Sequence, residues 1–407
     1  MKKLELLSPC GDYERLVTAI HFGADAVYFA GKRFGLRAFS DNFDEEEIIK
    51  ATTYAHEHNV KVYITVNILA HNEDFNGLLD YLKFLDKVHV DGVIVSDLGI
   101  ASLVTKYTSL ELHVSTQANI TNVYSAKMWV NLGAKRLVLA RELSLEEIKA
   151  IKKELPEDID IECFGHGAMC ISYSGRCLLS NYLTGRDSNK GACAQPCRWN
   201  YALGIKNSKD DTVYYPILED NKGTYILNSK DLCLIEHIKD LVEAGITSLK
   251  IEGRMKSNYY VATVTNAYRR AIDDYYNKKH PSFDYIEELQ KTSNRAFTTG
   301  FYYHSDHKTN NETSSLSQTH KYIAVVLDQD KEGFIKVEHR NKFKLGDTLE
   351  VLSPTSNFDK TIKVNEIIDC YGNKLEEVKK IKEQVYIKSD LKLEKYDILR
   401  MKENNEN

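Results

Sequence analysis

The chain has 407 residues, of which 43% are hydrophobic and 28% charged, which is typical of a protein with a packed core. A net charge of -5 argues against a protein coated with positive charge for indiscriminate nucleic-acid binding, although it permits a local basic face. The apolar run at the N-terminus is too short for a secretory signal, and no stretch has the roughly 18 apolar residues of a membrane span. We therefore expect a cytoplasmic protein with reduced thiols and no membrane association.

Short apolar segments alternate with helical patterns from the first residues onward. Strands are expected at residues 4–8, 26–30, 60–68, 92–96, 112–117, 136–140, 159–164 and 248–252. Helices are expected at residues 12–22, 44–58, 76–88, 144–154, 233–243 and 258–276. This alternation predicts an α/β fold, a TIM-like (β/α)8 barrel of parallel strands, with an open doubly wound sheet as the alternative.

Several of the expected strands carry polar side chains on one face. Because successive side chains alternate across a strand, the apolar faces would pack on the outer helices and the polar faces would point into the lumen. Buried polar groups are costly unless each is paired. We interpret them as a site at the carboxyl ends of the strands, and a satisfied structural network is the alternative. The residues concerned are Asn67, His113, Gln117, Glu162, His166, Lys250, Glu252 and Arg254.

Cysteines gather in the segment that follows the seventh strand. Six of the eight lie between residues 163 and 233, among glycines and other small residues: Cys163, Cys170, Cys177, Cys193, Cys197 and Cys233. Four thiolates are the usual donor set of an iron–sulfur cluster, so the segment favours a cluster pocket. Zinc also accepts four thiolates, but its sites usually contain two close pairs, and only Cys193 and Cys197 are close. Zinc and ordinary buried thiols stay open, whereas disulfides would need an oxidising compartment.

The alternating pattern ends after residue 282. We expect the barrel to span residues 1–282, with the Cys-rich, cluster-binding insertion at about 164–233. Residues 283–318 are polar and rich in turn residues, which predicts a linker. Short strands between residues 319 and 403 predict a small β-barrel domain, and residues 404–407 are expected to be a disordered tail.

Long motifs in the chain resemble those of a known family. The segment FGHGAMCISYSGRCLLS is very similar to the signature of the collagenase-like peptidase family U32. The opening ELLSPCGDYERLVTAIHFGADAVYFAGKRFGLRAF and the later KIEGRMKSNYYVATVTNAYRRAID and NRAFTTGFY resemble the same family, so the resemblance covers nearly the whole chain. The subgroup that it most resembles is the tRNA uridine hydroxylases, which form 5-hydroxyuridine at the wobble position and depend on prephenate.

The resemblance implies an eight-stranded barrel, an iron–sulfur (4Fe-4S) cluster and an oxygen-insertion reaction on RNA. The tRNA anticodon loop would be the partner and prephenate the co-substrate, while the electron donor is not identified. Cys170, Cys177, Cys193 and Cys233 match the family's cluster cysteines, and Cys197 is a possible substitute ligand.

Roles for the other site residues follow from their chemistry. His113, Gln117, Glu162, His166 and Glu252 are candidates to bond the uracil edge or move protons. Asn67, Arg176, Arg198, Lys250 and Arg254 are candidates to bind substrate. Among these, guanidinium groups suit the two carboxylates of prephenate because they bind carboxylates bidentately. A surface ion pair is the alternative for any single arginine.

The sequence indicates the residues that would contact RNA less clearly than it indicates the site residues. Basic residues on or beside the last barrel helix and in the small β domain are candidates for a phosphate-binding face, or for ordinary solvated surface: Lys256, Arg269, Arg270, Lys278, Lys279, Lys342, Lys344, Lys360 and Lys363. Tyr124, Tyr173 and Tyr182 are candidates to stack on bases.

Three other functions stay open. The family name suggests a peptidase, although neither H-E-x-x-H nor G-x-S-x-G occurs in the chain. The substrate could be another RNA, such as ribosomal RNA. The chain could also be a non-catalytic, cluster-bearing partner of another enzyme.

Overall fold

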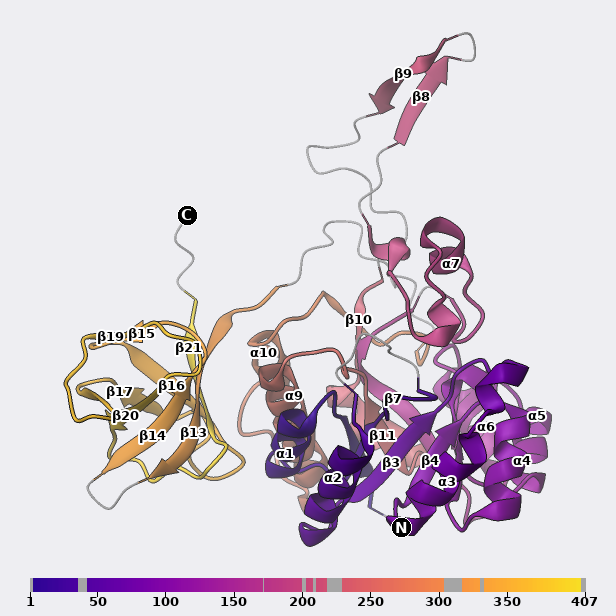
Figure 1. Cartoon of the computed structure of the whole chain (residues 1–407), viewed down its shortest axis with the longest axis horizontal. Helices are drawn as coiled ribbons and strands as arrows, with labels where there is room; N and C mark the ends of the chain where they lie inside the picture. The colour runs from indigo at the N-terminus through magenta and orange to yellow at the C-terminus, as the bar shows by residue number, and fades with distance from the viewer. Residues whose placement is uncertain are drawn as a thin grey trace. The chain divides into compact units, whose positions relative to one another are not determined.

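The computed structural model describes residues 3–35, 42–170, 172–199, 203–207, 210–217, 229–303, 317–329 and 333–403. Figure 1 shows the chain coloured by residue number. Two compact units interleave along the sequence. The barrel unit comprises Met1–Tyr13, Asp25–Met255 and Asn294–Leu316. The C-terminal unit comprises Glu14–Ala24, Lys256–Ser293 and Ser317–Asn407.

Eight parallel strands form the centre of the barrel unit. Each pairs with the next along the chain, and the last pairs with both the first and the seventh, so the sheet closes on itself. This confirms the predicted (β/α)8 barrel and contradicts the open doubly wound alternative. The strands are β1 (Glu5–Pro9), β2 (Ala26–Phe29), β3 (Lys61–Val66), β4 (Gly92–Val95), β5 (Glu111–Val114), β6 (Ala134–Val138), β7 (Asp160–Ala168) and β11 (Ser248–Ile251).

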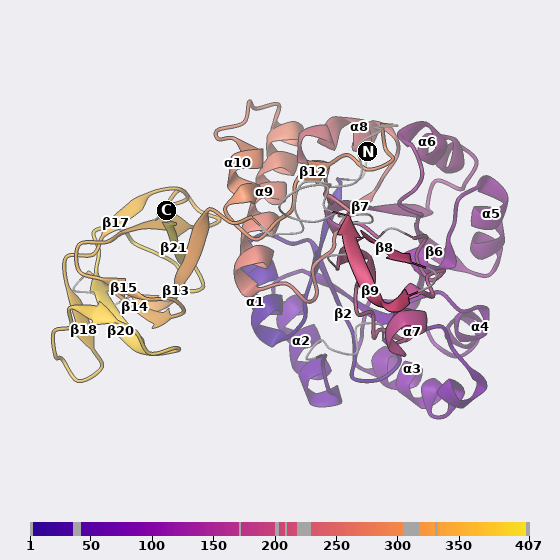
Figure 2. The same cartoon turned by 90° about the horizontal axis from the view of Figure 1, so that it is seen from above.

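Helices surround these strands in the view of Figure 2. The helices of the barrel unit are α2 (Glu45–Glu57), α3 (Leu78–Lys87), α4 (Leu98–Tyr107), α5 (Val123–Asn131), α6 (Leu145–Lys153) and α8 (Ile238–Glu243). Side chains fix where several of them begin. Asp44 and Glu47 form a capping box on α2, Ser144 and Glu147 form one on α6, and Asp97 caps α4.

The prediction of a helix at residues 233–243 is wrong at the start of that range. Asp231–Cys233 forms strand β10, which pairs antiparallel with the end of β7, and α8 begins only at Ile238. The reason is the length of β7, which continues through Gly165 to Ala168 and offers its backbone to another strand. Strand β12 (Phe297–Thr298) then pairs with β10.

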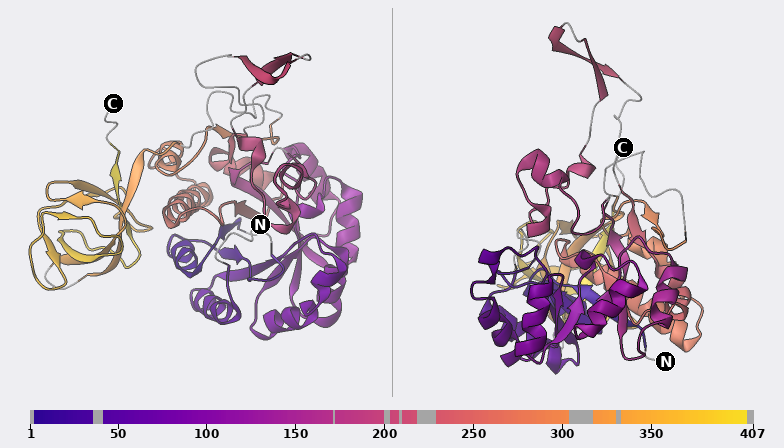
Figure 3. Two further views of the ribbon diagram at one scale, coloured as in Figure 1. Left: turned by 45° about the horizontal axis from the view of Figure 1, so that its top comes forward. Right: turned by 90° about the vertical axis from the view of Figure 1, so that its right-hand side faces the viewer.

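The Cys-rich insertion leaves the barrel between β7 and β10, as Figure 3 shows. It contains α7 (Leu179–Thr184), the short 3-10 turns Ser188–Lys190 and Pro196–Arg198, and a hairpin of β8 (Leu203–Asn207) and β9 (Asp210–Ile217). Residues 218–228 of the predicted insertion lie outside the described residues.

The C-terminal unit combines an antiparallel β domain with three helices. Its main sheet has the order β17-β16-β21-β13-β14-β20-β18, and β15 pairs with β19. The strands are β13 (His320–Gln329), β14 (Phe334–His339), β15 (Phe343–Lys344), β16 (Thr348–Leu352), β17 (Thr361–Lys363), β18 (Ile367–Asp369), β19 (Glu377–Val378), β20 (Gln384–Lys388) and β21 (Ile398–Lys402). The helices are α1 (Tyr13–His21), which belongs to this unit from Glu14 onward, α9 (Asn258–Asn277) and α10 (Tyr285–Gln290).

Helices α1 and α9 share a hydrophobic core with the β domain. Phe22, which follows α1, packs with Tyr259 and Ala262 of α9 and with Leu352 and Ile398 of the sheet. Thus two helices that follow the first and last barrel strands in sequence belong to the same unit as the C-terminal β domain. Within residues 283–318 the structure forms α10 and β12, while residues 304–316 and the tail 404–407 lie outside the described part.

A buried ion network also holds the C-terminal unit together. The Arg400 guanidinium donates to both carboxylate oxygens of Glu288, at 2.6 and 2.8 Å, and also contacts Glu350. Lys291 Nζ lies 2.8 Å from Glu350 Oε1. Burial would raise the pKa of Glu350, but His320, Arg400 and Lys291 together hold it below its ordinary value. None of the helices in the described ranges combines the length and the apolar character needed to cross a bilayer.

Candidate functional site at the barrel mouth

The lower part of the lumen is a paired charge network. Arg136 is 2% exposed, and its guanidinium reaches Glu5 Oε1 at 2.5 Å, Asp160 Oδ2 at 3.2 Å and Glu162 Oε2 at 3.3 Å. Glu162 also accepts from Lys250 Nζ at 2.7 Å. Both oxygens of the Glu162 carboxylate are paired in this network, which has a structural explanation, so the structural alternative applies to Glu162.

His113 lies in the same lower region and lines neither of the two cavities described below. Its Nε2 is 3.2 Å from Glu111 Oε2, at the start of β5, and its ring packs edge-on against Tyr63. Burial and the nearby Arg136 lower the pKa of His113, although Glu111 opposes this. The imidazole is therefore held in its neutral form, away from the carboxyl ends of the strands.

A small cavity of about 80 Å³ occupies the upper lumen. Five of the predicted site residues line it: Asn67, Gln117, Lys250, Glu252 and Arg254. Asn67 Nδ2 donates to Ser115 Oγ at 3.2 Å, and Arg254 Nη1 donates to Thr65 Oγ1 at 3.1 Å. These side chains come from β3, from the turn after β5 and from β11, so the closure of the barrel brings together residues that are far apart in sequence.

Lys250 is the cation in the wall of this cavity. Its ammonium lies 4.2 Å from the centre of the Tyr28 ring and is paired with Glu162 below. Burial lowers the pKa of Lys250 from its ordinary value, and Glu162 opposes that effect. A buried amine of this kind can hold or release a proton more readily than a surface lysine.

One residue of this cavity wall, Arg141, had no signal in the sequence. Arg141, after β6, lies over the Phe164 ring at 4.3 Å and donates to Ala168 O at 3.0 Å. Its Nη2 is also 3.5 Å from Ser174 Oγ in the Cys-rich insertion. Only the three-dimensional position distinguishes Arg141 from a surface arginine.

The Cys-rich insertion is anchored over the barrel mouth by hydrogen bonds. Asn119 Nδ2 donates to Ser174 O at 2.7 Å and Leu69 N donates to Asn189 O at 3.2 Å, while Ser188 Oγ donates to Cys177 O at 2.8 Å within the insertion. Ser188 and Gly191 of the insertion contribute to the wall of the small cavity. The insertion and the strand ends therefore form one site.

Gly175 makes the closest approach of the insertion to the barrel. Its φ is +74°, and a Cβ atom there would lie 2.9 Å from Gln117 Oε1 and 3.1 Å from Gln117 O. Only glycine fits this position without strain. Gln117 Oε1 is buried and has no hydrogen-bond partner among the described residues, so it is a free acceptor at the centre of the site.

Four thiols of the insertion lie near one another. Burial raises the pKa of the Cys197 thiol and the Arg198 guanidinium opposes this, while Cys170, Cys193 and Cys177 add to the rise. Cys233 is buried at the end of β10, and Cys163 is buried within β7. The thiols of Cys170, Cys177 and Cys193 thus lie near enough to Cys197 to affect its pKa.

Within the described ranges, no three His, Cys, Asp or Glu side chains are close enough to hold one metal ion. A multi-iron cluster differs from a single ion because each thiolate binds a different iron, so its ligands lie further apart. The all-thiol donor set fits such a cluster chemically. Arg198 follows Cys197 in the chain, and Arg295 lies close enough to both for them to affect its pKa, which burial lowers. The positive charges of these two arginines suit the negative charge of a thiolate-bound cluster.

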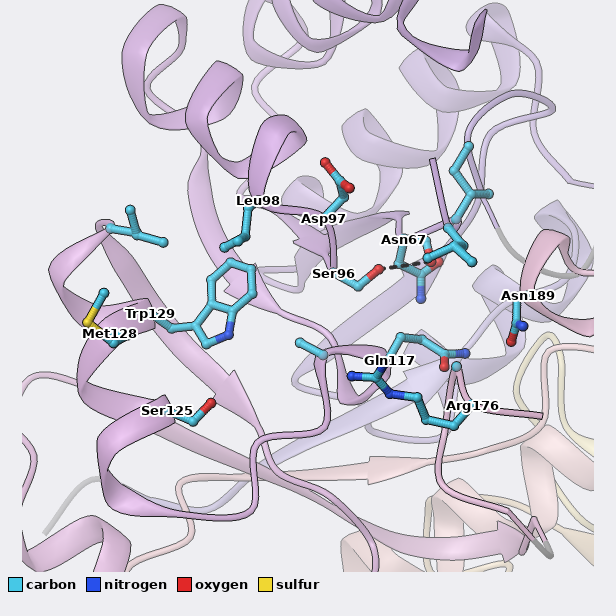
Figure 4. A pocket seen from close by; sticks show the side chains of 15 residues that line it. Asn67, Ser96, Asp97, Leu98, Gln117, Ser125, Met128, Trp129, Arg176 and Asn189 are labelled. Carbon is cyan, nitrogen blue, oxygen red and sulfur yellow. Dashed lines mark hydrogen bonds between the residues drawn. The ribbon is translucent and has the colours of Figure 1, made fainter. Parts of the chain in front are cut away.

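A larger pocket of about 470 Å³ lies beside the small cavity, on the side of α4 and α5. Figure 4 shows Leu98 and Trp129 on one side of it and Gln117, Arg176 and Asn189 on the other. Asn67 and Gln117 line both this outer pocket and the small cavity, so the two are adjacent. Arg176 is the predicted arginine here, and its guanidinium forms no ion pair with the described residues.

The remaining predicted residues lie elsewhere. His166 is buried and packs against the Phe297 ring, 5.7 Å away, and lines neither cavity. Arg198 donates to Met169 O at 2.9 Å beside the thiols. Arg270 donates to the backbone oxygens of Ser353 and Thr355, so it has a structural role in the C-terminal unit.

Other candidate RNA contacts are partly engaged. Arg269 pairs with Asp273, Lys256 donates to Ser293 and Lys342 pairs with Glu377. The three tyrosines predicted to stack on bases are all exposed: Tyr124 by 83%, Tyr182 by 87% and Tyr173 by 48%.

Comparisons with known proteins agree with this architecture. The family model for peptidase family U32 matches residues 11–312, and the model for the C-terminal domain of the same family matches residues 318–400. The chain is 40% identical to "tRNA hydroxylation protein P1" of Bacillus subtilis, over 98% of this chain and 95% of that one. It is 36% identical to "tRNA hydroxylation protein P" of Escherichia coli, over 89% of each chain. It is also 40% identical to an "uncharacterized protease" of Methanocaldococcus jannaschii, over 88% of each chain.

Proposed function

Because the chain belongs to peptidase family U32, and two similar relatives are named for tRNA hydroxylation, we propose that it is a tRNA hydroxylase. The observation that carries this proposal is the cavity at the barrel mouth. Its wall joins polar strand-end side chains to a thiol-rich insertion. Barrel enzymes act at this end of their strands, and oxidation of a base needs redox chemistry that ordinary side chains do not supply.

The specific reaction that we propose is the conversion of the wobble uridine to 5-hydroxyuridine. Replacing the C5–H bond of the uracil ring by C5–OH removes two electrons from the base and one proton from the ring, so the reaction also requires an oxygen donor and an acceptor for the two electrons. Enzymes that modify a base take it out of the stack, and bases of the anticodon loop are already partly unpaired. The uracil would enter the upper lumen from the side of the insertion.

The cavity of about 80 Å³ is smaller than typical ligand pockets, which measure about 300–1,000 Å³. Entry of a base therefore requires side chains at the mouth to move outward. Ser188 and Gly191 of the insertion lie in the wall, so a shift of the insertion would enlarge the cavity. Binding of substrate and position of the insertion would then be coupled.

An iron–sulfur cluster, proposed as four-iron, would be held by Cys170, Cys177 and Cys233, with either Cys193 or Cys197 as the fourth ligand. When bound, it would supply the one-electron chemistry that the reaction needs. The proximity of Cys197 to Cys170 and Cys177 supports it as a ligand beside Cys233. Arg198 and Arg295 would offset the negative charge of the thiolates.

The residues of the cavity wall have distinct tasks in this proposal. Asn67 and Gln117 are placed to bond the uracil edge, since the amide of Gln117 has a free acceptor. Lys250, with its lowered pKa, and Glu252 are the candidates to accept and pass on the C5 proton. Prephenate is proposed as co-substrate, and Arg254 is the cavity-lining arginine that suits a carboxylate.

Nucleoside mass spectrometry of tRNA from cells with and without this chain tests the function. Loss of 5-hydroxyuridine and its derivatives, restored by the wild-type gene, is the expected result. The ligand set is tested separately by iron content and visible absorbance of anaerobically purified protein. Cys170→Ala and Cys177→Ala should lose both, whereas Cys10→Ala, at the buried end of β1, should keep them. A colourless protein with stoichiometric zinc would refute the cluster.

Peptidase activity is the second candidate, because the family and one similar relative carry that name. Ser174 Oγ lies 3.5 Å from a guanidinium nitrogen of Arg141, which is a cationic rather than a basic neighbour. Cleavage of gelatin by the purified chain, lost in Ser174→Ala and independent of iron, would favour the peptidase. Unchanged tRNA together with hydroxylated ribosomal RNA would instead redirect the proposal to another RNA.

A further inference from the structure

The outer pocket has the size and the walls of a site for a flat, partly apolar ligand. Its volume of about 470 Å³ falls within the range of about 300–1,000 Å³ for small-molecule sites. The indole of Trp129, with Leu98 and Met128, forms an apolar side, and Figure 4 shows these residues facing the space from α4 and α5. Trp129 is only 7% exposed, so a base would stack on the part of the indole that borders the pocket.

Polar groups line the opposite side and connect the outer pocket to the upper lumen. Asn67 and Gln117 belong to both spaces, and the Oε1 atom of Gln117 is buried with no hydrogen bond to any described residue. Ser96 and Asp97 add hydroxyl and carboxylate oxygens at the base of α4. A ligand here can therefore combine an apolar face with hydrogen-bonding edges, as nucleobases do.

Arg176 supplies a cation beside these polar groups. Its side chain extends beside Gln117 in Figure 4, and its guanidinium has no ion pair with the described residues. Gly175 holds it there, because the preceding backbone packs directly on Gln117. In a strand of RNA, a phosphate links the riboses of two successive nucleotides, so an arginine near the residues shared by the two spaces suits the phosphate that joins a base in one space to a base in the other.

Exposed apolar side chains continue the pocket along α5. Tyr124, Met128 and Leu132 are spaced four residues apart on that helix, and Met128 and Leu132 line the pocket. All three are exposed, Met128 by 61%. Apolar residues at this spacing would normally face a core, so their exposure points to a ligand that covers them.

We propose that the outer pocket holds the base of a nucleotide next to the one being hydroxylated, with Arg176 on the phosphate between them. This rests on the proposed RNA-modifying function and adds a second base site to it. The neighbouring base stacks on the Trp129 side and fixes the register of the strand. The reacting base then turns into the lumen past Asn67 and Gln117. Recognition of the neighbour gives the enzyme selectivity for sequence around its target.

Trp129 makes this directly measurable, since Trp129 and Trp199 are the chain's two tryptophans. Trp199→Phe leaves Trp129 as the fluorescent reporter. The probe is a stem–loop RNA with an unpaired target uridine, prepared also with an abasic site at the target or at either neighbour. We expect the intact RNA and the target-abasic RNA to quench Trp129, and abasic replacement of one neighbour to abolish the quenching while the RNA still binds.

A pair of surface variants provides an independent check. Met128→Glu places a charge in the pocket and should weaken binding of the stem–loop about tenfold, the scale of losing one stacked base. Ile49→Glu adds the same charge at an exposed apolar residue of α2, outside the pocket, and should change binding less than about twofold. Equal effects of the two variants would overturn the proposal.

The other outcomes assign the pocket differently. Loss of quenching with the target-abasic RNA alone would overturn the proposal in favour of the reacting base in this pocket. Quenching by prephenate alone, and not by RNA, would overturn it in favour of the co-substrate. If the stem–loop is hydroxylated but Trp129 does not respond, the second base site fails and the proposed function stands. If Trp129 responds but tRNA in cells keeps its 5-hydroxyuridine without this chain, the function fails and the base site stands.

Discussion

Glu162 in the barrel unit and Glu350 in the C-terminal unit are both carboxylates held between two cations. Glu162 lies 2.7 Å from Lys250 and 3.3 Å from Arg136, and Glu350 lies 2.8 Å from Lys291 and also contacts Arg400. Only Glu162 reaches a cavity through its partner, because Lys250 lines the upper lumen. The same arrangement therefore adjoins a cavity in one unit and lies in the folded interior of the other.

Glu350 gives a prediction for stability against pH. Its folded-state pKa is below the ordinary value of 4.5, so its ion pairs stabilise the C-terminal unit above that pH. This contribution should be lost as the pH falls through the lower, folded-state pKa. In Glu350→Gln, the stability should be lower at neutral pH and should fall less steeply under acid. Urea unfolding at a series of pH values measures both, and a parallel acid response in the two proteins would contradict the prediction.

Residue identities in the lumen were only partly predictable. Alternation along β3 and β11 correctly indicated that Asn67, Lys250, Glu252 and Arg254 line one space. His113 follows the same alternation, but its ring contacts Glu111 and Tyr63 and lines neither cavity. Alternation fixes the face of a strand and not the depth in the barrel. Arg141 and Arg295 could not be found at all, because an isolated arginine in sequence has no sign that distinguishes burial from exposure.

Substitutions at two glycines of the Cys-rich insertion can distinguish the effect of backbone strain from the effect of contact with the barrel. Gly175 and Gly185 both have positive φ, +74° and +70°, so alanine strains the backbone at either position. A Cβ at Gly175 would collide with Gln117, whereas at Gly185 it would meet nothing within 4 Å. Gly175→Ala should therefore displace the insertion from the barrel mouth and reduce hydroxylation at least about tenfold.

Gly185→Ala is the matched control, and it should keep most of the activity. Hydroxylation of a tRNA transcript, measured with the thermal unfolding midpoint of each variant, gives the comparison. Similar activity losses in the two variants would mean that strain in the insertion, rather than its contact with Gln117, limits the enzyme.

At the level of elements, the barrel was predictable and two of its helices were not. The strand–helix alternation suffices for β1 to β7 and β11, because buried parallel strands are short, apolar and regularly spaced. Helices α4 and α5 gave no clear periodic signal. Leu98 on α4 and Tyr124, Met128 and Leu132 on α5 are exposed, so the apolar residues do not follow a single buried face. The residues that obscure the pattern are those that border the outer pocket.

For the whole molecule, the C-terminal β domain completes a core that begins at α1. Leu352 and Ile398 cover Phe22, Tyr259 and Ala262 in the C-terminal unit. A chain ending at residue 303 would expose these side chains to water. We expect it to aggregate or to bind a hydrophobic dye, whereas a chain ending at residue 403 should behave as the full-length protein.

Size-exclusion chromatography and dye fluorescence of the two truncated chains provide the measurement. A monodisperse chain of residues 1–303 with no increase in dye binding would show that the shared core is dispensable. Sequence could not reveal this core, because an amphipathic helix shows that one of its faces is buried but not which element buries it.

The interleaving of the two units also limits how the protein can be recombined. A chimera that exchanges only the segment after residue 316 between two relatives would pair a foreign sheet with the host's α1 and α9. A compatible graft must carry Glu14–Ala24 and Lys256–Ser293 with it, although both segments lie within the part of the chain matched by the barrel's family model. The modules that can be inherited or engineered as wholes are therefore discontinuous in sequence.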